Sequence, residues 1–539
     1  SSAASDVYKR QIIQTATNYI SAYGACRAEL YIGRDLKRET FNHLQTLSFS
    51  YFNQNSVGYT HARVMSDTDR IASTLAWGLM EAVWYIAYLL LAIVMMFVLN
   101  WKLALCVMVI VPVLVLSGAY FQKKLVFFHR RVREQNSKIT GAFNEGITGA
   151  KTTKTLVIED KVEQEFDDLT GEMKRLSVRA MHFRGVFMST TAFAASIALA
   201  IVLWRGGVIT RDGVILIGTL SVFMNYAQGM MEPIQWLVQV MSSLVNVQVN
   251  VERVTRLLET ESDVSDTPEV TAKYGDAFHP KKENWEPLHG DIEFQDVTFR
   301  YPDGSENVLE HFNLKVPQGT NVAIVGETGA GKSTLVNLVC RFFEPTQGRI
   351  LIDGRDARER SQLWLHSNIG YVLQTPHLFS GTVLENLRYG RPDATMDEIE
   401  AAVKAVSADQ IIARLPDGYN TDIGEGGNTL STGEKQLLSF ARALLADPRI
   451  FVLDEATSSV DTVTEQLIQN AIEKVMTGRT SFIIAHRLST IRRADVILVV
   501  HDGKIIESGT HRSLMEAKGA YYQLYTRQYR EEQTRSMME

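Results

Sequence analysis

Four stretches of this chain contain no charged residue, and each is long enough to cross a membrane as a helix. They are Ala82–Leu99, Leu103–Gln122, Gly185–Trp204 and Gly213–Met231. A helix needs roughly 17–25 mostly apolar residues to cross about 30 Å of hydrocarbon. All four stretches lie before residue 232, and none occurs after about Asp291. The sequence therefore predicts a helical membrane domain followed by a domain of a different kind.

The order of the four stretches predicts two membrane hairpins. Only Asn100, Trp101 and Lys102 separate the first two, so we expect a tight external turn there. The segment from Lys123 to Lys138 carries six basic residues and one acid, which places that end in the cytoplasm by the positive-inside rule. We expect the second external loop over Arg205–Asp212.

Two polar segments of helical character border these hairpins. They run from Asp35 to Arg70 and from Gln135 to Arg184, too long for surface turns. We predict that both form helical hairpins reaching into the cytoplasm, with bends near Gln54–Arg63 and Gly146–Ile158. The moderately apolar stretch from Ile12 to Gly33 is expected to be the inner end of a membrane helix whose outer part precedes this sequence.

The charge balance and the cysteines exclude several classes of protein. A net charge of −6 argues against a nucleic-acid-binding partner, because such proteins carry basic patches. The three cysteines, Cys26, Cys106 and Cys340, have neither paired nor metal-ligand spacing. We therefore expect no disulfide framework and no zinc site.

The second part of the chain contains a phosphate-binding loop. An apolar strand over Asn321–Val325 runs directly into Gly326, Glu327, Thr328, Gly329, Ala330, Gly331, Lys332, Ser333 and Thr334. This spacing fits the loop whose backbone N–H groups cradle phosphates at the start of a helix. In such a loop Lys332 neutralises phosphate charge and the Ser333 hydroxyl ligates Mg²⁺. These residues predict binding of ATP with Mg²⁺.

A second apolar strand, Ile450–Leu453, ends in two acids. The first, Asp454, is suited to hold Mg²⁺ through water, and the second, Glu455, to polarise an attacking water. Two acids after a buried strand can also simply begin a helix. The loop upstream favours the catalytic interpretation.

The segment from Leu430 to Gln436 carries a resemblance. Its sequence, Leu-Ser-Thr-Gly-Glu-Lys-Gln, is similar to the LSGGQ signature of the ATP-binding cassette (ABC) family, and the whole chain resembles that family's exporter-type half-transporters. Further elements match in order: Tyr301, Gln374, Thr421–Gly427, Ser458–Asp461 and His486. The resemblance covers about Gln11 to Gln528.

The resemblance implies a role for each matching residue. Tyr301 would stack on adenine, and Gln374 would sense Mg²⁺ together with Ser333 and Asp454. The signature residues Ser431, Gly433 and Glu434 and the interface residue Asp461 would complete the ATP site of a second chain. His486 would contact the γ-phosphate and act with Glu455 and Lys332 in hydrolysis.

Two residues depart from the family signature. Thr432 stands where Gly is usual, and Glu434 stands where Gln is usual. An added Cβ and an added charge near phosphate predict slow hydrolysis at the site that this signature completes. Such asymmetry favours a heterodimer of two half-transporters, while a homodimer stays open.

The domain boundaries follow from these features. We predict a transmembrane domain over 1–258, a linker over 259–290, an ABC ATP-binding domain over 291–528 and a C-terminal tail over 529–539. The fold class is thus an α-helical transmembrane domain joined to an α/β P-loop NTPase domain. The protein would lie in the cell membrane as a multi-pass protein, with its nucleotide-binding domain in the cytoplasm.

The predicted function is ATP-driven export of a hydrophobic or amphiphilic solute, of the drug, lipid or peptide class. Polar residues inside the fourth stretch, Asn225, Tyr226 and Gln228, could face a central cavity. An ATP-gated channel or regulatory subunit without uphill transport is the alternative. The uncharged stretches disfavour a soluble ATPase.

Overall fold

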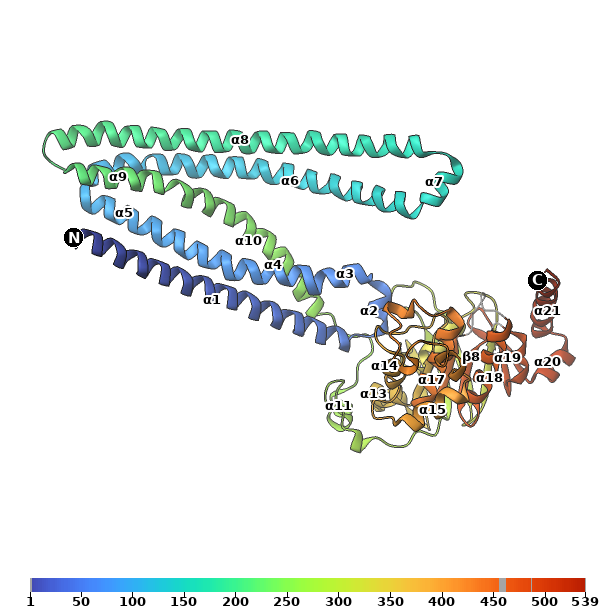
Figure 1. Cartoon of the computed structure of the whole chain (residues 1–539). Coiled ribbons are helices and arrows are strands. Elements are labelled where there is room, and N and C mark those ends of the chain that lie inside the picture. Colours follow the sequence, from blue (N-terminus) through green and yellow to red (C-terminus); the bar gives the residue numbers. More distant parts are fainter. Residues whose placement is uncertain (1, 455–461, 486, 539) are drawn as a thin grey trace. The chain divides into compact units, whose positions relative to one another are not determined.

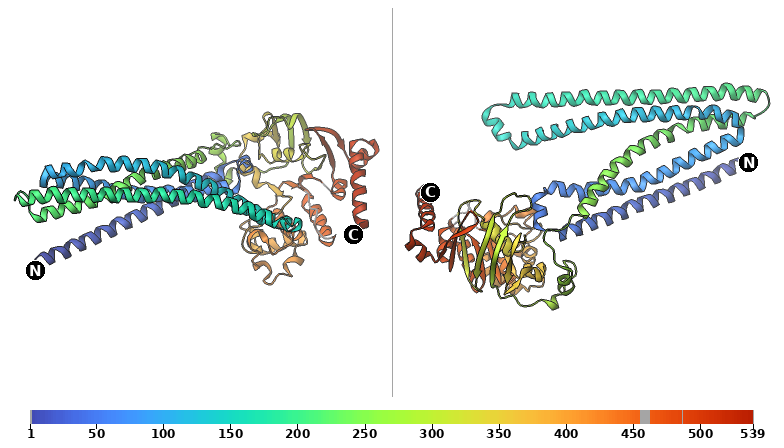
Figure 2. Two further views of the ribbon diagram at one scale, coloured as in Figure 1. Left: turned by 90° about the horizontal axis from the view of Figure 1, so that it is seen from above. Right: turned by 180° about the vertical axis from the view of Figure 1, so that it is seen from behind.

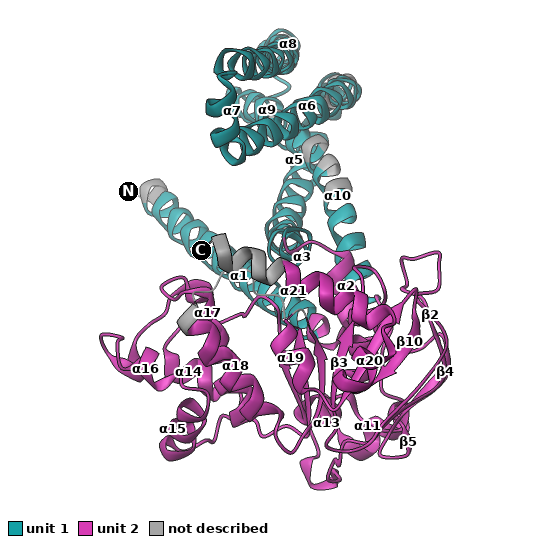
Figure 3. Cartoon of the chain, turned by 90° about the vertical axis from the view of Figure 1, so that its right-hand side faces the viewer, with its two compact units in different colours: residues 1–42, 58–259 teal, residues 43–57, 260–539 magenta. Residues whose placement is uncertain are grey.

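The computed structural model describes residues 2–454, 462–485 and 487–538 (Figure 1). The chain forms two compact units, coloured separately in Figure 3. Unit 1 comprises residues 1–42 and 58–259, and unit 2 comprises residues 43–57 and 260–539. The described part of unit 1 is helical, whereas unit 2 combines helices with two sheets. The expected division into a helical part and an α/β part is therefore present.

Unit 1 is built from long helices. They are α1 (Ser2–Thr46), whose last turn belongs to unit 2, α3 (Val57–His61), the π-helical turns η1 (Ala62–Asp67) and η2 (Thr74–Gly78), α4 (Thr68–Ser73), α5 (Leu79–Met108), α6 (Ile110–Thr148), α7 (Ala150–Leu156), α8 (Glu159–Arg211), α9 (Ile217–Gly229) and α10 (Met231–Leu258). Met96 and Leu103 of α5 and Phe223 of α9 are fully buried in the core of this unit.

Two described helical runs are long and apolar enough to cross a membrane, Val57–Met108 and Glu159–Arg211. The predicted turn between the first two uncharged stretches lies at Asn100, where the backbone is extended (φ −161°, ψ 104°) inside α5. The Asn100 side-chain oxygen accepts a hydrogen bond from the Leu103 N–H at 3.1 Å. The amide side chain thus caps the helical turns that follow, as Asn commonly does.

The prediction of an external loop over Arg205–Asp212 was wrong. Helix α8 continues to Arg211, and the turn follows it before α9. The glycine at position 206 lies within the helix and allows α8 and α9 to pack closely. A Cβ at this position would lie 2.4 Å from Leu220 Cδ1 of α9. A sequence cannot distinguish a glycine that ends a helix from one that brings two helices together.

The second polar hairpin consists of α6 and α8, which lie side by side along much of their length (Figure 2). The Gln135 amide of α6 donates to the Leu169 carbonyl of α8 at 3.0 Å. The chain bends at Gly149 and again at Val157, a left-handed residue (φ 53°) that ends α7. Both bends lie within the predicted Gly146–Ile158 segment.

Unit 2 contains the other helices and all described strands. Its helices are α2 (Phe49–Gln54), α11 (Pro268–Tyr274), η3 (Lys282–Asn284), α12 (Lys332–Val339), η4 (Ala357–Glu359), α13 (Gln362–Ser367), α14 (Val383–Arg388), α15 (Met396–Ala405), α16 (Asp409–Ile412), η5 (Gly418–Asn420), η6 (Glu425–Gly427), α17 (Thr432–Leu445), α18 (Thr462–Met476), α19 (Leu488–Arg493), α20 (His511–Ala517) and α21 (Ala520–Met538). Its strands are β1 (Ile292–Phe299), β2 (Leu309–Val316), β3 (Asn321–Val325), β4 (Gln347–Ile352), β5 (Arg355–Asp356), β6 (Ile369–Val372), β7 (Ile450–Asp454), β8 (Thr480–Ile484), β9 (Val496–His501) and β10 (Lys504–Gly509).

The strands form two sheets that enclose one helix. A four-stranded antiparallel sheet has the order β2-β1-β4-β5, and a six-stranded sheet has the order β10-β9-β3-β8-β7-β6. In the larger sheet all neighbours are parallel except β10 and β9. Leu335 and Val336 of α12 pack in one core with residues of both sheets, and the opposite face of the larger sheet packs against α17 and α18. The carboxyl ends of β3 and β7 therefore lie at one edge, where ligands bind in such folds.

Two segments that precede the sheets belong to unit 2. Phe49 of α2 stacks on Phe342 with ring centroids 5.2 Å apart, and His43 Nε2 contacts the Thr260 carbonyl at 3.0 Å. Residues 260–290, which make up all but the first residue of the predicted linker (259–290), are folded onto the same unit. Tyr274 is 1% exposed, and the Trp364 indole N–H donates to the Glu286 carbonyl at 2.7 Å.

Candidate functional site

The phosphate-binding loop lies between β3 and the start of α12, as its sequence predicts. Gly326 leaves β3 so close to β9 that a Cβ would lie 2.2 Å from the Val500 carbonyl oxygen. Gly331 has φ 99°, a left-handed conformation that favours glycine. The two glycines thus allow the chain to pass β9 and then turn into α12. The first N–H groups of α12 have no partner within the helix, so they are available to a phosphate bound in the loop.

The Lys332 side chain is 8% exposed and lies over the loop. Its ammonium donates to the carbonyls of Gly326 at 2.9 Å and Glu327 at 2.7 Å. Burial lowers the pKa of Lys332, and the nearby Asp454 carboxylate partly opposes this shift. A buried ammonium that donates to two backbone carbonyls is well placed to meet a phosphate anion.

Tyr301 is fixed on the other side of the cleft. Its ring packs edge-on against Phe299 and Phe343, with centroids 4.9 and 5.1 Å away. Its hydroxyl shares a hydrogen bond of 2.9 Å with the Thr334 hydroxyl in the first turn of α12. The ring plane is therefore set before any ligand arrives.

These residues line one cleft. Tyr301, Lys332, Ser333, Thr334, Gln374 and Asp454 are all brought together there, with Thr328, Gly329 and Gly331 of the loop. Two apolar residues missing from the sequence prediction also line it, Val308 and Ile484. Ile484 ends β8, so its position beside β3 was readable from the strand pattern. Val308 follows an irregular turn and gave no signal.

The predicted signature residues lie outside this cleft. Ser431 is the N-cap of α17, Gly433 is buried in its first turn, and Glu434 is half-buried. Among the residues that the structure describes, none of these three lines the cleft. Glu455, Asp461 and His486 lie outside the described residues, and their placement at the site stays a prediction.

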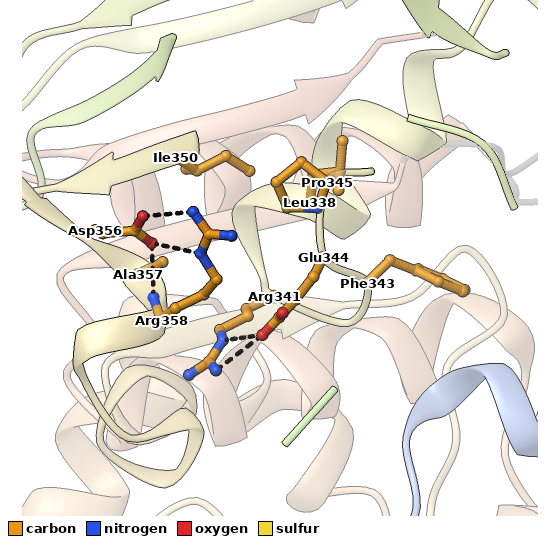
Figure 4. Close-up of a pocket in the computed structure, with 9 residues that line it drawn as sticks. All are labelled: Leu338, Arg341, Phe343, Glu344, Pro345, Ile350, Asp356, Ala357 and Arg358. Carbon is orange, nitrogen blue, oxygen red and sulfur yellow. Dashed lines mark hydrogen bonds and ion pairs between the residues drawn. The ribbon is translucent and has the colours of Figure 1, made fainter. Parts of the chain in front are cut away.

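A second, much smaller pocket lies between α12 and β5 (Figure 4). Its walls carry two ion pairs, Arg358 with Asp356 at 2.7 Å and Arg341 with Glu344 at 2.9 Å. Burial raises the pKa of Asp356, but the hydrogen bonds from Arg358 outweigh it and hold that pKa below its ordinary value. Arg341 also pairs with Asp266 at 2.8 Å. The charges in this pocket pair with one another, so it serves to hold the fold together.

The fold and the cleft define the class of the protein: a helical membrane unit and a P-loop nucleotide-binding unit on one chain, the architecture of an ABC exporter subunit. Comparison with known proteins agrees. The family model described as "ABC transporter transmembrane region" matches residues 11–234, and the model described as "ABC transporter" matches residues 309–458.

Relatives match along nearly the whole chain. An uncharacterized ABC transporter ATP-binding protein of Bacillus subtilis is 36% identical over 495 residues, 92% of this chain and 80% of the relative. An ATP-dependent lipid A-core flippase of Desulfotalea psychrophila is 36% identical over 498 residues, 92% of this chain and 84% of the relative. A bacterial Atm1-family ABC exporter with ATP bound superimposes with a TM-score of 0.77 at 28% identity, covering 93% of this chain and 86% of that structure.

The chain belongs to the ABC transporter family. It is a membrane-embedded, ATP-driven exporter subunit that binds and hydrolyses ATP, and its fold implies a dimer. The predicted fold class and the predicted exporter function are confirmed.

Proposed function

We propose that two such chains, or this chain and a related one, export a hydrophobic or amphiphilic solute, with ATP bound between the cleft of one chain and the signature of the other. The observation that supports this is the separation of the two halves of the site. The cleft holds Lys332, Ser333 and Asp454, while Ser431, Gly433 and Glu434 lie on another helix outside it.

Mg²⁺ fits the donors of the cleft. Mg²⁺ prefers oxygen ligands and usually keeps several waters while sharing phosphate oxygens. Ser333, Gln374 and Asp454 supply a hydroxyl, an amide and a carboxylate around the cleft. When bound, the ion would offset phosphate charge. Lys332 would bind the β- and γ-phosphates, Tyr301 would stack on adenine, and Glu455 with His486 would orient the attacking water.

ATP would drive the cycle through differential binding. ATP favours the closed dimer only as far as it binds that state more tightly than the open one, and hydrolysis removes this preference. The nucleotide-binding unit would face the cytoplasm, where ATP is available. Closure of the two nucleotide-binding units would switch the membrane helices to a conformation that is open to the outside.

The class of solute is proposed from the membrane unit. The relative from Desulfotalea psychrophila is named for a lipid, lipid A-core. In the present chain, Asn225 and Gln228 of α9 are exposed, and Tyr226 is half-buried. Polar groups among apolar ones suit an amphiphile.

Reconstitution in liposomes tests this function. Purified protein with ATP and Mg²⁺ should move a fluorescent phospholipid or a lipophilic dye against its gradient, and Lys332→Ala should abolish both transport and ATPase activity. ATP-dependent leak without uphill movement would favour a channel instead. Robust ATPase activity and transport by the chain alone would support a homodimer over the heterodimer that the altered signature favours.

A further inference from the structure

The first turn of α17 contains a contact that bears on how readily this transporter closes. The Glu434 carboxylate accepts hydrogen bonds from both donors of Ser431, the backbone N–H at 2.8 Å and the hydroxyl at 2.9 Å. The Ser431 hydroxyl in turn accepts from the Glu434 N–H at 3.3 Å. Ser431 therefore has no hydrogen-bond donor left for a further anion in this arrangement.

The carboxylate stands where an anion is favoured. A helix N-terminus attracts negative charge, because its first N–H groups are unsatisfied and its dipole is positive there. Within the described part of the chain, no ion pair joins a basic side chain to Glu434, and the carboxylate is held by the helix end and the two donors of Ser431. Ser431 and Thr432 beside it are exposed, and the helix end is open to a partner.

We propose that Glu434 is an internal competitor for the terminal phosphate of ATP. This rests on the proposed function, in which Ser431 of one chain binds the γ-phosphate held by the other. For that contact to form, the Ser431 donors must leave the Glu434 carboxylate. The carboxylate must then either move away or remain near a second anion.

Charge, and not shape, is the source of this competition. A glutamine side chain has the same size and presents an oxygen that accepts the same two hydrogen bonds, but it carries no charge. Glu434 therefore raises the ATP concentration needed for closure without altering α17. The contact keeps the dimer open when ATP is scarce.

Substituting the charge alone tests the proposal. The complete transporter, with whichever partner it assembles, would be reconstituted in nanodiscs, and its ATPase rate measured against the concentration of ATP with Mg²⁺. Glu434→Gln should lower the half-maximal ATP concentration about tenfold, the effect expected of one like-charge contact that is partly screened. Inhibition by ADP should stay unchanged, because ADP lacks the γ-phosphate.

The matched control is Glu385→Gln. Thr382 and Glu385 make the same arrangement at the start of α14, with Glu385 accepting from the Thr382 N–H at 2.7 Å and from its hydroxyl at 3.1 Å. This variant should leave the ATP dependence unchanged. Mere weakening of a helix cap would make closure harder, so the direction of the shift separates a charge effect from a structural one.

An unchanged or raised half-maximal ATP concentration in Glu434→Gln would overturn the proposal, as would an equal gain in affinity for ADP. Either result would leave the proposed exporter function intact, provided that the unsubstituted protein still shows ATP-driven transport. A lack of ATP-driven transport in the unsubstituted protein would instead count against the exporter function.

Discussion

One methyl group decides whether the phosphate-binding loop can form at Gly326. A Cβ there would lie 2.2 Å from the Val500 carbonyl, so Gly326→Ala must displace the loop from β9. We expect at least a tenfold loss of ATP affinity and about 1–3 kcal/mol of lost stability. Binding of a fluorescent ATP analogue and thermal unfolding would measure both.

The control for that substitution lies in the same loop. Gly329 has φ 85°, but a Cβ there meets no atom within 4 Å. Gly329→Ala therefore adds only the cost of a left-handed residue, about 1–2 kcal/mol, without a clash. Because Gly329 lines the cleft, the two variants are compared by thermal unfolding, and an equal loss of stability in both would show that the clash with β9 is not the cause.

A buried histidine makes the stability of the nucleotide-binding unit depend on pH. Burial lowers the pKa of His366 below its ordinary value of 6.5, and the Arg341 charge adds to this, although the hydrogen bond to the Cys340 carbonyl opposes it. The unfolded chain therefore binds a proton that the folded chain does not. The contribution of His366 to the free energy of unfolding is therefore fully present above about pH 6.5. As the pH falls below this value, the contribution decreases by at most about 1.4 kcal/mol per pH unit.

Thermal unfolding of the whole protein between pH 5 and pH 8 measures this loss. In His366→Gln the amide can still donate to Cys340 but cannot titrate, so the decline below pH 6.5 should become shallower. An identical pH profile in the two proteins would show that His366 is not the group responsible.

At the scale of elements, a buried arginine holds the segment before the sheets onto the nucleotide-binding unit. Arg341 is 3% exposed and pairs with Asp266 and Glu344, and it donates to the Arg360 carbonyl at 2.7 Å. Arg341→Met leaves two carboxylates without their cation. We expect a loss of about 3–5 kcal/mol. Arg512→Met, which breaks the exposed pair with Glu516, should cost under about 1 kcal/mol in the same unfolding assay.

Helix α2 offers a test of coupling between ATP hydrolysis and transport. The stacking of Phe49 on Phe342 contributes about 0.5–1.5 kcal/mol beyond burial. Phe49→Ala should leave ATP binding intact and reduce the number of solute molecules moved per ATP. Parallel transport and ATPase assays would show this, and an unchanged ratio would exclude the contact from coupling.

Local patterns predicted the elements well and their long-range contacts poorly. The strand before the phosphate loop, the Asn100 turn and the bends at Gly149 and Val157 all depend on residues close in sequence, and the sequence placed them. The Asp266–Arg341 pair joins residues 75 positions apart, and the glycine at position 206 packs against a helix that comes later. Such contacts form only in the folded chain and leave no local pattern in the sequence. For this reason the sequence predicted a linker where residues 260–290 are folded onto unit 2.

In the assembled transporter we expect each ATP site to be shared by two chains. The cleft and the signature lie on the same unit but at separate places. The ATPase activity that remains should therefore depend on whether a defective cleft and a defective signature lie in the same chain or in different chains. We expect Lys332→Ala to disable a cleft and Ser431→Arg to disable a signature.

The most direct test compares two dimers that carry these same two substitutions, isolated with two affinity tags. With Lys332→Ala in one chain and Ser431→Arg in the other, both defects fall in one shared site, and the second site stays intact. If the sites are shared, this dimer keeps about half of the original ATPase activity, and a dimer with both substitutions in one chain keeps almost none. The reverse result, with activity only when both substitutions lie in one chain, would show that each chain holds a complete site and that the sites are not shared.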